Sequence, residues 1–265
     1  MSILFFYGLD EGSSGNVSGT AADQGSSALT LSYVPVSTDL QWTSDGEGSG
    51  VFFNAAAETS DARVEATINA AVVAALNSSK TFTFVFKRGS SLTADYYATR
   101  FYLGASGGSP AILYEYAGGP GLHIFSIMGN AFLFYNGSEY TVISVDTAQA
   151  AMADRVKIYG WDGVDTVVPI TPDGGYGTSG DNFIAQDAVI SGLSTSDYLT
   201  IGNRPTGGLN PAGTIKAVAL DTTALDSAAV ESLMAALDVD DDVSWAGGGG
   251  SSTSLLLANS NQGGM

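Results

Sequence analysis

The chain has no cysteine and a single histidine, His123, among its 265 residues. Without cysteine it has no disulfide framework, no thiolate metal site and no cysteine nucleophile. One histidine gives little support for a zinc site or a Ser-His-Asp triad, and no G-x-S-x-G segment is present. His123 lies in an apolar strand pattern (GLHIFSI), where packing is the favoured role and a catalytic base the alternative. These absences argue against most catalytic and metal centres.

Charged residues are scarce and mostly of one sign. They make up 14% of the chain, against about 25% in typical globular domains. Nine basic and 27 acidic residues give a net charge of −18, which repels the phosphates of nucleic acids and of anionic membrane surfaces. We therefore expect no nucleic acid and no membrane as partner. No apolar run approaches the ~18 residues of a transmembrane helix. Met1 to Asp10 lacks the basic start of a secretory signal peptide, so we expect folding in a cytoplasm.

What the sequence does contain is many short apolar runs separated by Gly, Asn, Asp, Ser and Pro, a pattern typical of all-β sandwiches and barrels. Thr81 to Lys87 (TFTFVFK) alternates as a strand with two different faces does. Two further segments read as hairpins, because an Asn-Gly or Asp-Gly pair fits the φ > 0 positions of a type I′ turn. These are Phe132 to Ile143, around Asn136-Gly137, and Val156 to Ile170, around Asp162-Gly163.

Two short helices interrupt the strand pattern. Asn69 to Asn77 (NAAVVAALN) is rich in alanine and precedes the Thr81 strand. Near the end, Asp226 or Ser227 can cap a helix whose apolar residues recur at helical spacing. We expect that this apolar stripe packs against the sandwich. Its members are Val230, Leu233, Met234 and Leu237.

The C-terminal end differs from the body in composition. We expect one domain over residues 1–245, followed by a flexible Gly/Ser-rich tail over residues 246–265. Ordering such a tail costs about 1–2 kcal/mol per residue in backbone entropy. Contact of its apolar residues with a neighbouring subunit would offset that cost, and packing on the tail's own domain is the alternative. These residues are Leu255, Leu256 and Leu257.

Several segments, in order, resemble laminin-G-like, concanavalin-A-like jelly rolls. The opening resembles their first strand and turns, and the ending resembles their L-x-I-G-N, G-x-I-x-x-V and short-helix sequence. The resemblance implies a two-sheet antiparallel jelly-roll sandwich, with Ile3 to Tyr7 pairing beside Thr214 to Leu220. The segments are Tyr7 to Leu31 (YGLDEGSSGNVSGTAADQGSSALTL), Gly50 to Asn54 (GVFFN), Tyr198 to Asn203 (YLTIGN), Gly213 to Leu220 (GTIKAVAL) and Leu225 to Leu237 (LDSAAVESLMAAL).

The same resemblance implies a structural Ca²⁺ where the first and last strands meet. The matching positions are Asp10 or Glu11 on the first turn and Asp221 after the late strand, with Asp23 as a further candidate. Calcium suits such a site because it takes carboxylate and carbonyl oxygens. The alternative is that Asp10 and Asp23 bond only to their own turns.

Paired carboxylates of the glycosidase kind are not recognisable. Some jelly-roll relatives are β-glucanases with an E-x-D-x-E-like strand, in which alternate residues face one bond. The nearest acidic run, Asp238 to Asp242, has no Glu and no strand pattern, and it fails the EF-hand loop. Sugar binding instead needs an aromatic face. Trp161 at a hairpin tip and Tyr176 in a Gly-rich loop are the candidates, whereas the strand tyrosines are expected to serve in packing.

These features together favour a non-catalytic structural protein of a bacteriophage virion, either a head-decorating protein or a component of a tail or fibre. It would act through protein–protein assembly with other virion proteins and copies of itself, after assembly in the host cytoplasm. The alternative is a lectin-like carbohydrate-binding module, for which a host surface glycan would be the partner. We expect no cofactor besides the structural Ca²⁺ considered above.

The expected role of the tail can be tested by truncation. A chain that ends at Asp242 should fold normally and lose assembly, because the predicted core elements end with the helix at Leu237. The melting temperature and the solution mass measure the two effects. A large fall in the melting temperature of the isolated domain would show that the tail packs on its own domain.

Overall fold

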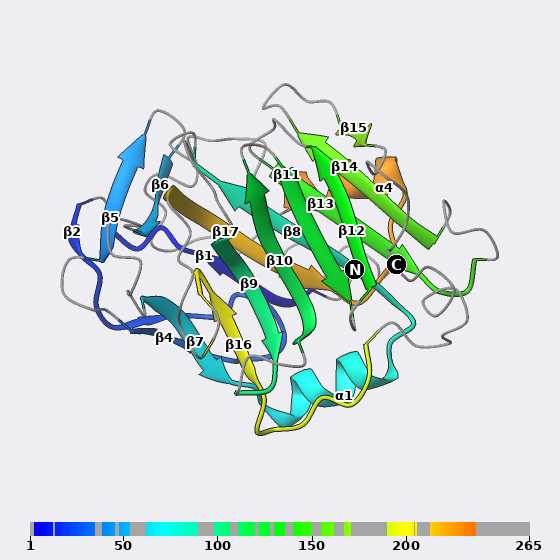
Figure 1. Cartoon of the computed structure of the whole chain (residues 1–265), viewed down its shortest axis with the longest axis horizontal. Coiled ribbons are helices and arrows are strands. Elements are labelled where there is room, and N and C mark those ends of the chain that lie inside the picture. Colours follow the sequence, from blue (N-terminus) through cyan, green and yellow to red (C-terminus); the bar gives the residue numbers. More distant parts are fainter. Residues whose placement is uncertain are drawn as a thin grey trace, which may run out of the picture.

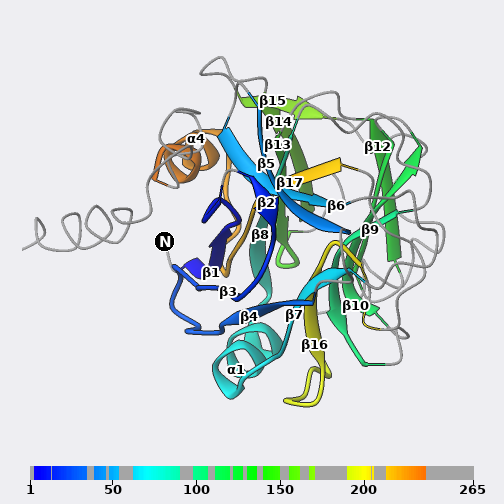
Figure 2. The ribbon, with the colours of Figure 1, turned by 90° about the vertical axis from the view of Figure 1, so that its left-hand side faces the viewer.

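The computed structural model describes residues 3–12, 14–34, 39–45, 48–53, 62–89, 98–106, 111–119, 122–127, 130–135, 140–149, 155–161, 167–170, 190–203, 205 and 213–236. Within these ranges two antiparallel sheets pack face to face, as Figure 2 shows from one end. Two short helices accompany them. The predicted all-β, two-sheet sandwich is therefore confirmed.

The nine-stranded sheet lies at the back of Figure 1. In spatial order its strands are β15 (Val167–Ile170), β14 (Val156–Trp161), β13 (Tyr140–Asp146), β8 (Thr81–Arg88), β17 (Gly213–Asp221), β6 (Gly48–Phe53), β5 (Leu40–Asp45) and β2 (Gly15–Asn16), with β1 (Ile3–Gly8) also paired to β17.

The eight-stranded sheet forms the front layer of Figure 1. Its strands, in spatial order, are β12 (Asn130–Tyr135), β11 (Leu122–Ile127), β10 (Ala111–Gly119), β9 (Ala98–Gly104), β16 (Tyr198–Ile201), β7 (Arg63–Thr67), β4 (Leu31–Val34) and β3 (Thr20–Ala21).

The first strand of the chain pairs with the last one, as predicted. Ile3 lies opposite Asp221 and Gly8 opposite Ala217. On the same side of β17, residues 213–215 pair with β6. The other edge of β1 is covered by residues 23–27, whose backbone N–H groups donate to carbonyls of β1. The backbone of β1 thus has a hydrogen-bonding neighbour at each edge. It needs both, because the strand is fully buried and cannot bond to water.

The core between the sheets is built from the alternating inner positions of the strands. Phe82, Phe84 and Phe86 of β8 face the eight-stranded sheet and belong to this main cluster. The ring of Phe84 lies 4.7 Å from that of Phe101 on β9 and 5.8 Å from that of Phe125 on β11. The alternation seen in the sequence therefore sets which rings meet at the centre of the sandwich.

Helix α1 (Ala70–Ser78) closes one end of the core, at the bottom of Figure 1. Asn69 caps it, because its side-chain oxygen accepts from the N–H of Val72 at 3.0 Å. Val72 and Leu76 are buried in the main cluster. Asn77 fixes the far end by two hydrogen bonds with the backbone of Leu193, at 2.8 and 3.0 Å. The predicted helix is confirmed.

Helix α4 (Ser227–Ala236) covers part of the outer face of the nine-stranded sheet, as Figure 2 shows. The carboxylate of Asp226 accepts from the N–H of Ala229 at 2.9 Å and acts as the predicted cap. Val230 and Leu233 are buried in a second apolar cluster with Phe6 and other residues on this face. The prediction that an apolar stripe packs on the sandwich is confirmed at these two positions.

The predicted hairpin around Asn136-Gly137 is wrong. β12 pairs with β11 in the eight-stranded sheet, whereas β13 pairs with β8 and β14 in the other sheet. Strands β12 and β13 therefore belong to different layers, and the Asn136-Gly137 pair itself lies outside the described residues. Strand β13 is buried along almost its whole length. Its backbone N–H and C=O groups are out of reach of water, so they need a paired strand at each edge, and β8 and β14 provide them. This tertiary pairing overrides a local turn signal.

The second predicted hairpin exists, but not with the predicted turn. β14 and β15 are antiparallel neighbours, and Trp161 pairs with Val167. A two-residue turn at Asp162-Gly163 would instead place Val164 opposite Trp161. The register leaves residues 162–166 between the strands, so the connection is longer than a type I′ turn.

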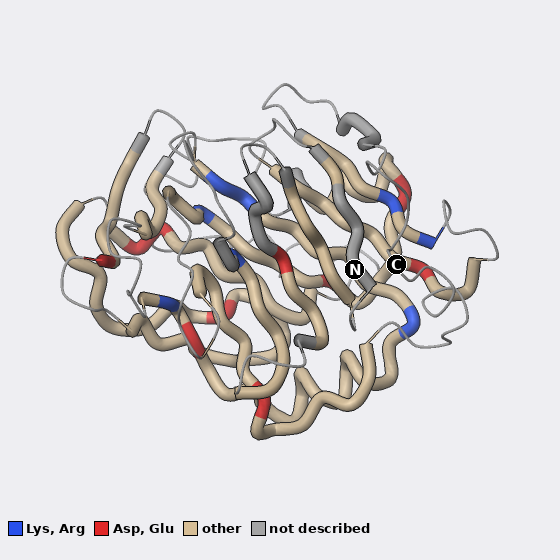
Figure 3. Tube along the Cα trace, viewed as in Figure 1, with Lys and Arg blue, Asp and Glu red and all other residues tan. Residues whose placement is uncertain are grey.

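No helix among the described residues is long and apolar enough to cross a membrane. The lysine and arginine positions drawn in Figure 3 are few and scattered along the trace.

Leu233 tests the packing of α4. Replacing it by alanine should lower the free energy of unfolding by about 2–5 kcal/mol, because a buried leucine loses transfer energy and leaves a cavity. Urea unfolding measures the change. The matched control on the same helix is Ser232→Ala at an exposed position, which should stay within about 0.5 kcal/mol. Equal effects of the two changes would contradict the observed facing of the helix.

Candidate functional site

Two aromatic side chains from opposite sheets meet at the end of the sandwich formed by β2, β4 and β5, on the left of Figure 1. Trp42 of β5 is half-buried and packs against the main core cluster, to which Tyr33 of β4 belongs. Their rings are 5.5 Å apart and nearly perpendicular, at 75°. This edge-to-face geometry is a favoured one for aromatic pairs, and it fixes the indole at the rim of the core.

The loop after β1 lies against the same pair. A Cβ atom added to Gly12 would lie 2.6 Å from carbons of the Trp42 ring, so the backbone of Gly12 touches the indole directly. Only glycine permits this approach, and any larger residue would displace the ring. Gly12 and Tyr33 together hold Trp42 in one orientation. We call Asp10, Glu11, Gly12, Tyr33 and Trp42 the Trp42 site.

A carboxylate is fixed beside the aromatic pair. The hydroxyl of Tyr33 donates to Oε2 of Glu11 at 2.8 Å, and Glu11 is otherwise exposed. Burial, together with the nearby Glu11 carboxylate, raises the pKa of Tyr33, so this hydroxyl keeps its proton and remains a donor. The site therefore places an acceptor next to the half-buried Trp42 side chain.

Asp10 adds a second acidic group. It is half-buried, and loss of hydration raises its pKa, although its backbone N–H and the charge of Lys87 offset part of the shift. The pKa of Glu11 is also raised, first by loss of hydration, and the charge of Asp10 adds to the effect. The site is thus acidic, and it favours neutral or cationic ligands over anionic ones.

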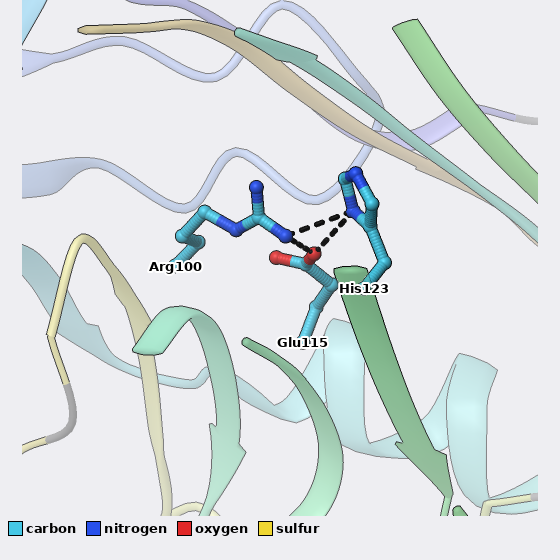
Figure 4. A network of polar contacts seen from close by, with 3 residues as sticks. All are labelled: Arg100, Glu115 and His123. Carbon is cyan, nitrogen blue, oxygen red and sulfur yellow. Dashed lines mark hydrogen bonds and ion pairs between the residues drawn. The ribbon is translucent and has the colours of Figure 1, made fainter. Parts of the chain in front are cut away.

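A separate polar cluster lies inside the sandwich. It consists of Arg100 on β9, Glu115 on β10 and His123 on β11, drawn together in Figure 4. The side chains of Arg100 and Glu115 are 1% and 0% exposed. Phe101 lies opposite Glu115 while Thr99 lies opposite Tyr116, so Arg100 is the extra residue of a β-bulge.

The bulge explains why an arginine points into the core. In a regular strand Arg100 and Phe101 would face opposite sides, but a bulge sets two successive residues against one. The Arg100 guanidinium then lies over the Phe86 ring of the other sheet, 5.3 Å from its centre. Glu115 and His123 need no such device, because they occupy inner positions of their strands beside Phe125.

The three groups share one carboxylate oxygen. Oε1 of Glu115 accepts from the Nη2 group of Arg100 and lies 3.0 Å from Nδ1 of His123. Burial alone would raise the pKa of Glu115, but Arg100 and His123 outweigh it, so that this pKa is lowered. Burial and the charge of Arg100 lower the pKa of His123 to about 4. His123 is therefore neutral at pH 7, beside a fixed Arg–Glu ion pair.

This buried network does not resemble a working active site. Its side chains are enclosed between the sheets, and the imidazole of His123 stacks on Phe134 at 5.1 Å. Within the described part of the chain, Oε2 of Glu115 and Nε2 of His123 have no hydrogen-bond partner. The sequence prediction that His123 is packed is borne out by its burial, but its ionic neighbours were not foreseen.

The structure does not bring the predicted calcium ligands together. Asp221 lies opposite Ile3 at one end of the β1–β17 ladder, and Asp10 follows the other end of β1. At about 3.3 Å per residue the two carboxylates are on the order of 20 Å apart, so they cannot share one ion. Oδ1 of Asp221 instead accepts from the N–H of Thr223 at 2.7 Å.

Asp23 is engaged in the turn that covers β1. Its Oδ1 accepts from the N–H groups of Phe6 and Gly25 at 2.9 and 2.7 Å, and its Oδ2 accepts from the hydroxyl of Ser27. The bonds from Gly25 and Ser27 lie within its own turn, as in the alternative, whereas the bond from Phe6 ties that turn to β1. Among the described residues, no group of three or more acidic or histidine side chains is placed to hold a metal ion.

The predicted sugar-binding and assembly residues lie largely outside what the structure describes. Trp161 is the last residue of β14, where its backbone pairs with Tyr140 and Val167. Tyr176 and the tail residues fall outside the described ranges. The tail residues are Leu255, Leu256 and Leu257.

Sequence reasoning missed the aromatic half of the Trp42 site. The chain has three tryptophans, and Trp42 alternates with the apolar Leu40, which marks it as a core-facing residue. No pattern in the neighbouring residues shows that β5 lies at the end of the sandwich, where a core-facing side chain such as Trp42 is only half-buried. The contact with Gly12 depends on how the loop after β1 folds back, which no spacing in the sequence reveals.

No protein-family model matches the chain, and no curated protein matches it. Solved structures show distant similarity. The sialidase of Trypanosoma rangeli is 14% identical with a TM-score of 0.48, over 90% of this chain and 33% of the sialidase. The binding domain of botulinum neurotoxin serotype G is 11% identical with a TM-score of 0.49, over 87% of this chain and 50% of the toxin chain.

A third similar structure is the CBM40 of the Ruminococcus gnavus IT-sialidase bound to α2,3-sialyllactose. It is 10% identical with a TM-score of 0.39, over 62% of this chain and 85% of that chain. The present chain thus spans about a third of the sialidase chain and half of the binding-domain chain of the toxin. Identities this low, with TM-scores below 0.5, assign this chain neither a family nor an activity.

The buried network predicts a pH dependence of stability. The pKa of His123 is about 4 in the folded state and 6.5 as its ordinary value. The unfolded chain therefore binds more protons in this window, and the folded state loses up to about 3 kcal/mol as the pH falls from 6.5 to 4. Because the pKa of Glu115 is also lowered in the folded state, stability falls further once the pH drops below the ordinary pKa of a glutamate. Urea unfolding across this range measures the slope.

His123→Phe is the informative variant. It keeps a ring for Phe134 to stack on but cannot take up a proton, so the difference in stability between the two proteins should change with pH. The carboxylates that do not contact His123 are common to both proteins and cancel in the comparison. Glu115 does not cancel, because His123 helps to lower its pKa, and it contributes only at the acid end of the range. A difference that stays constant from pH 7 to pH 4 would show that the imidazole is not held neutral by its surroundings.

Proposed function

We propose that the protein is a non-catalytic carbohydrate-binding module that takes a neutral glycan at the Trp42 site. One observation carries this proposal. The half-buried Trp42 side chain is held between Gly12 and Tyr33, next to the Glu11 carboxylate that Tyr33 orients. A sugar ring has an apolar C–H face, which can pack on the Trp42 indole, and hydroxyl donors, which can bond to the Glu11 carboxylate.

The charge of the site narrows the class of glycan. Asp10 and Glu11 lie side by side in a protein with a net charge of −18, and both carboxylates already have raised pKa values. A further negative charge, such as the carboxylate of sialic acid, would add repulsion at short range. Neutral hexose chains avoid that cost, and amino sugars would gain from attraction. We therefore expect sialylated glycans to be rejected.

The non-catalytic part of the proposal is supported by where the charged groups lie. The Arg100–Glu115–His123 network is enclosed between the sheets, away from the Trp42 site. Asp10 and Glu11 are neighbours on one loop, and Tyr33 holds an oxygen of Glu11 in a hydrogen bond. A virion setting, with copies of the same chain and other virion proteins as partners, stays a prediction from the sequence.

Trp42 is the residue on which binding should depend. Trp42→Ala should weaken binding to the best neutral oligosaccharide by about tenfold or more, which corresponds to about 1.4 kcal/mol. Trp42→Phe should retain part of the affinity, because a smaller aromatic face remains. The measurement is a glycan array with neutral and sialylated members, followed by titration calorimetry on the strongest hit.

Trp161→Ala is the matched control, since it removes another of the three tryptophans. Binding that survives Trp42→Ala but is lost in Trp161→Ala would move the site to the β14–β15 hairpin. Glu11→Gln keeps an acceptor and removes the charge, so it should relax the discrimination against sialyllactose. Hydrolysis of the bound glycan, abolished by Glu11→Gln, would make the protein an enzyme and overturn the non-catalytic proposal.

A further inference from the structure

The free edges of the two sheets are not alike. Within the described ranges the outermost strands of the two sheets are β2, β3, β15 and β12. Strands β2 and β3 have two residues each. Strand β15 has four residues, and one of them, Pro169, has no N–H to donate. Strand β12 (NAFLFY) has six residues, with neither proline nor charge.

These differences matter because an unpaired strand edge is a template for another strand. Proteins usually blunt such edges by short length, proline, charge or a covering segment. Three of the four edges show one of these devices, and β1 is covered along its free side by residues 23–27. Strand β12 shows none of them within the described residues, although all its residues pair with β11 on the other side.

Charge points to the same edge. The sequences of β11 (LHIFSI) and β12 contain no Asp, Glu, Lys or Arg, and His123 of β11 is neutral at pH 7. Two copies of a chain with a net charge of −18 repel each other at most contacts. A contact made through β12 places no charged residue of β11 or β12 at the interface between the two copies. It therefore suits a second copy of the same chain.

We propose that β12 is a dimerisation strand, which pairs antiparallel with β12 of a second copy about a two-fold axis perpendicular to the sheet. The symmetry makes the contact self-complementary and closed, since each copy offers the same edge, that of β12, to the other. The two eight-stranded sheets would then join into one continuous layer. A rotation about this axis leaves the inner face of each sheet on the inner side. Residues that lie opposite each other must therefore point to the same face, so one residue of β12 lies opposite the same residue of the second copy.

The inference does not depend on the proposed glycan binding. Trp42 and Tyr33 lie at the β4 end of the sandwich, whereas β12 ends the opposite side of the sheet. Seven strand spacings of about 4.8 Å separate β12 from β3, so pairing at β12 leaves the Trp42 site uncovered. Loss of the dimer should leave glycan binding per chain unchanged, and loss of Trp42 should leave the dimer intact.

The absence of cysteine makes a direct test possible. Single cysteines are introduced one at a time at all six residues of β12 in the full chain, and each protein is oxidised and run on a non-reducing gel. Directly opposed residues in antiparallel strands have Cα atoms about 4.5–5.5 Å apart, a spacing that a disulfide can bridge. Residues two positions from the axis are too far from their own copies. Cross-linking should therefore peak at one position.

Lys157→Cys is the matched control, because Lys157 is exposed on β14, which is already paired on both sides. Cross-linking that is equal at all β12 positions and at the control would overturn the proposal. So would a peak at Lys157→Cys. The predicted docking of residues 246–265 on a neighbour is a different contact, and a cross-link at β12 reports on the strand alone.

Sedimentation of the unmodified chain gives a second reading. We expect a concentration-dependent rise from 27.1 kDa to twice that mass, favoured at an ionic strength of about 1 M over about 0.01 M because salt screens the repulsion between copies. Leu133→Lys, which sets like charges near the axis, should abolish it while circular dichroism shows an unchanged fold. A wild-type protein that stays monomeric at every concentration and salt level would overturn the proposal.

Discussion

The two sheets stay together because their inner faces share one layer of phenylalanine rings around Phe84. Its ring contacts Phe86 on its own strand and both Phe101 and Phe125 across the layer. Large aromatic side chains supply much buried apolar area for few positions. The candidate site depends on this layer, because Tyr33 and Trp42 continue it to the open end of the sandwich. There the same kind of side chain that holds the sheets together is only half-buried, at Trp42.

The buried Arg–Glu–His network is an exception within that layer. Charges in an apolar interior are costly, and an ion pair there recovers the cost only through good geometry and further hydrogen bonds. Arg100 meets this condition in part, since its guanidinium bonds to Glu115 and lies over Phe86. The network also ties β9, β10 and β11 to one another from their buried side. An apolar substitute at one position alone would leave the remaining charge buried without its partner.

Local patterns predicted those features that depend on local physics. Alternation in Thr81 to Lys87 gave the central strand, and the Asn69 cap and the stripe around Leu233 gave both helices. Features that depend on which layer a segment joins were not predictable. The Asn136-Gly137 pair favours a turn, yet β13 joins the other sheet. Glu115 looks like one polar residue in a strand, and the bulge is what turns its ion-pair partner Arg100 toward it.

The pairing of the first strand with the last one also has a consequence in time. A ribosome adds about 5–20 residues per second, so β1 leaves the ribosome about 10–40 s before the strand that completes its pairing exists. During that interval its apolar sequence, ILFFYG, has only the nearby residues 23–27 to bond with. Closure of the nine-stranded sheet must therefore wait until β17 has been synthesised. This order favours a late step in folding over closure of the sheet as β1 emerges, since contacts between distant residues form slowly.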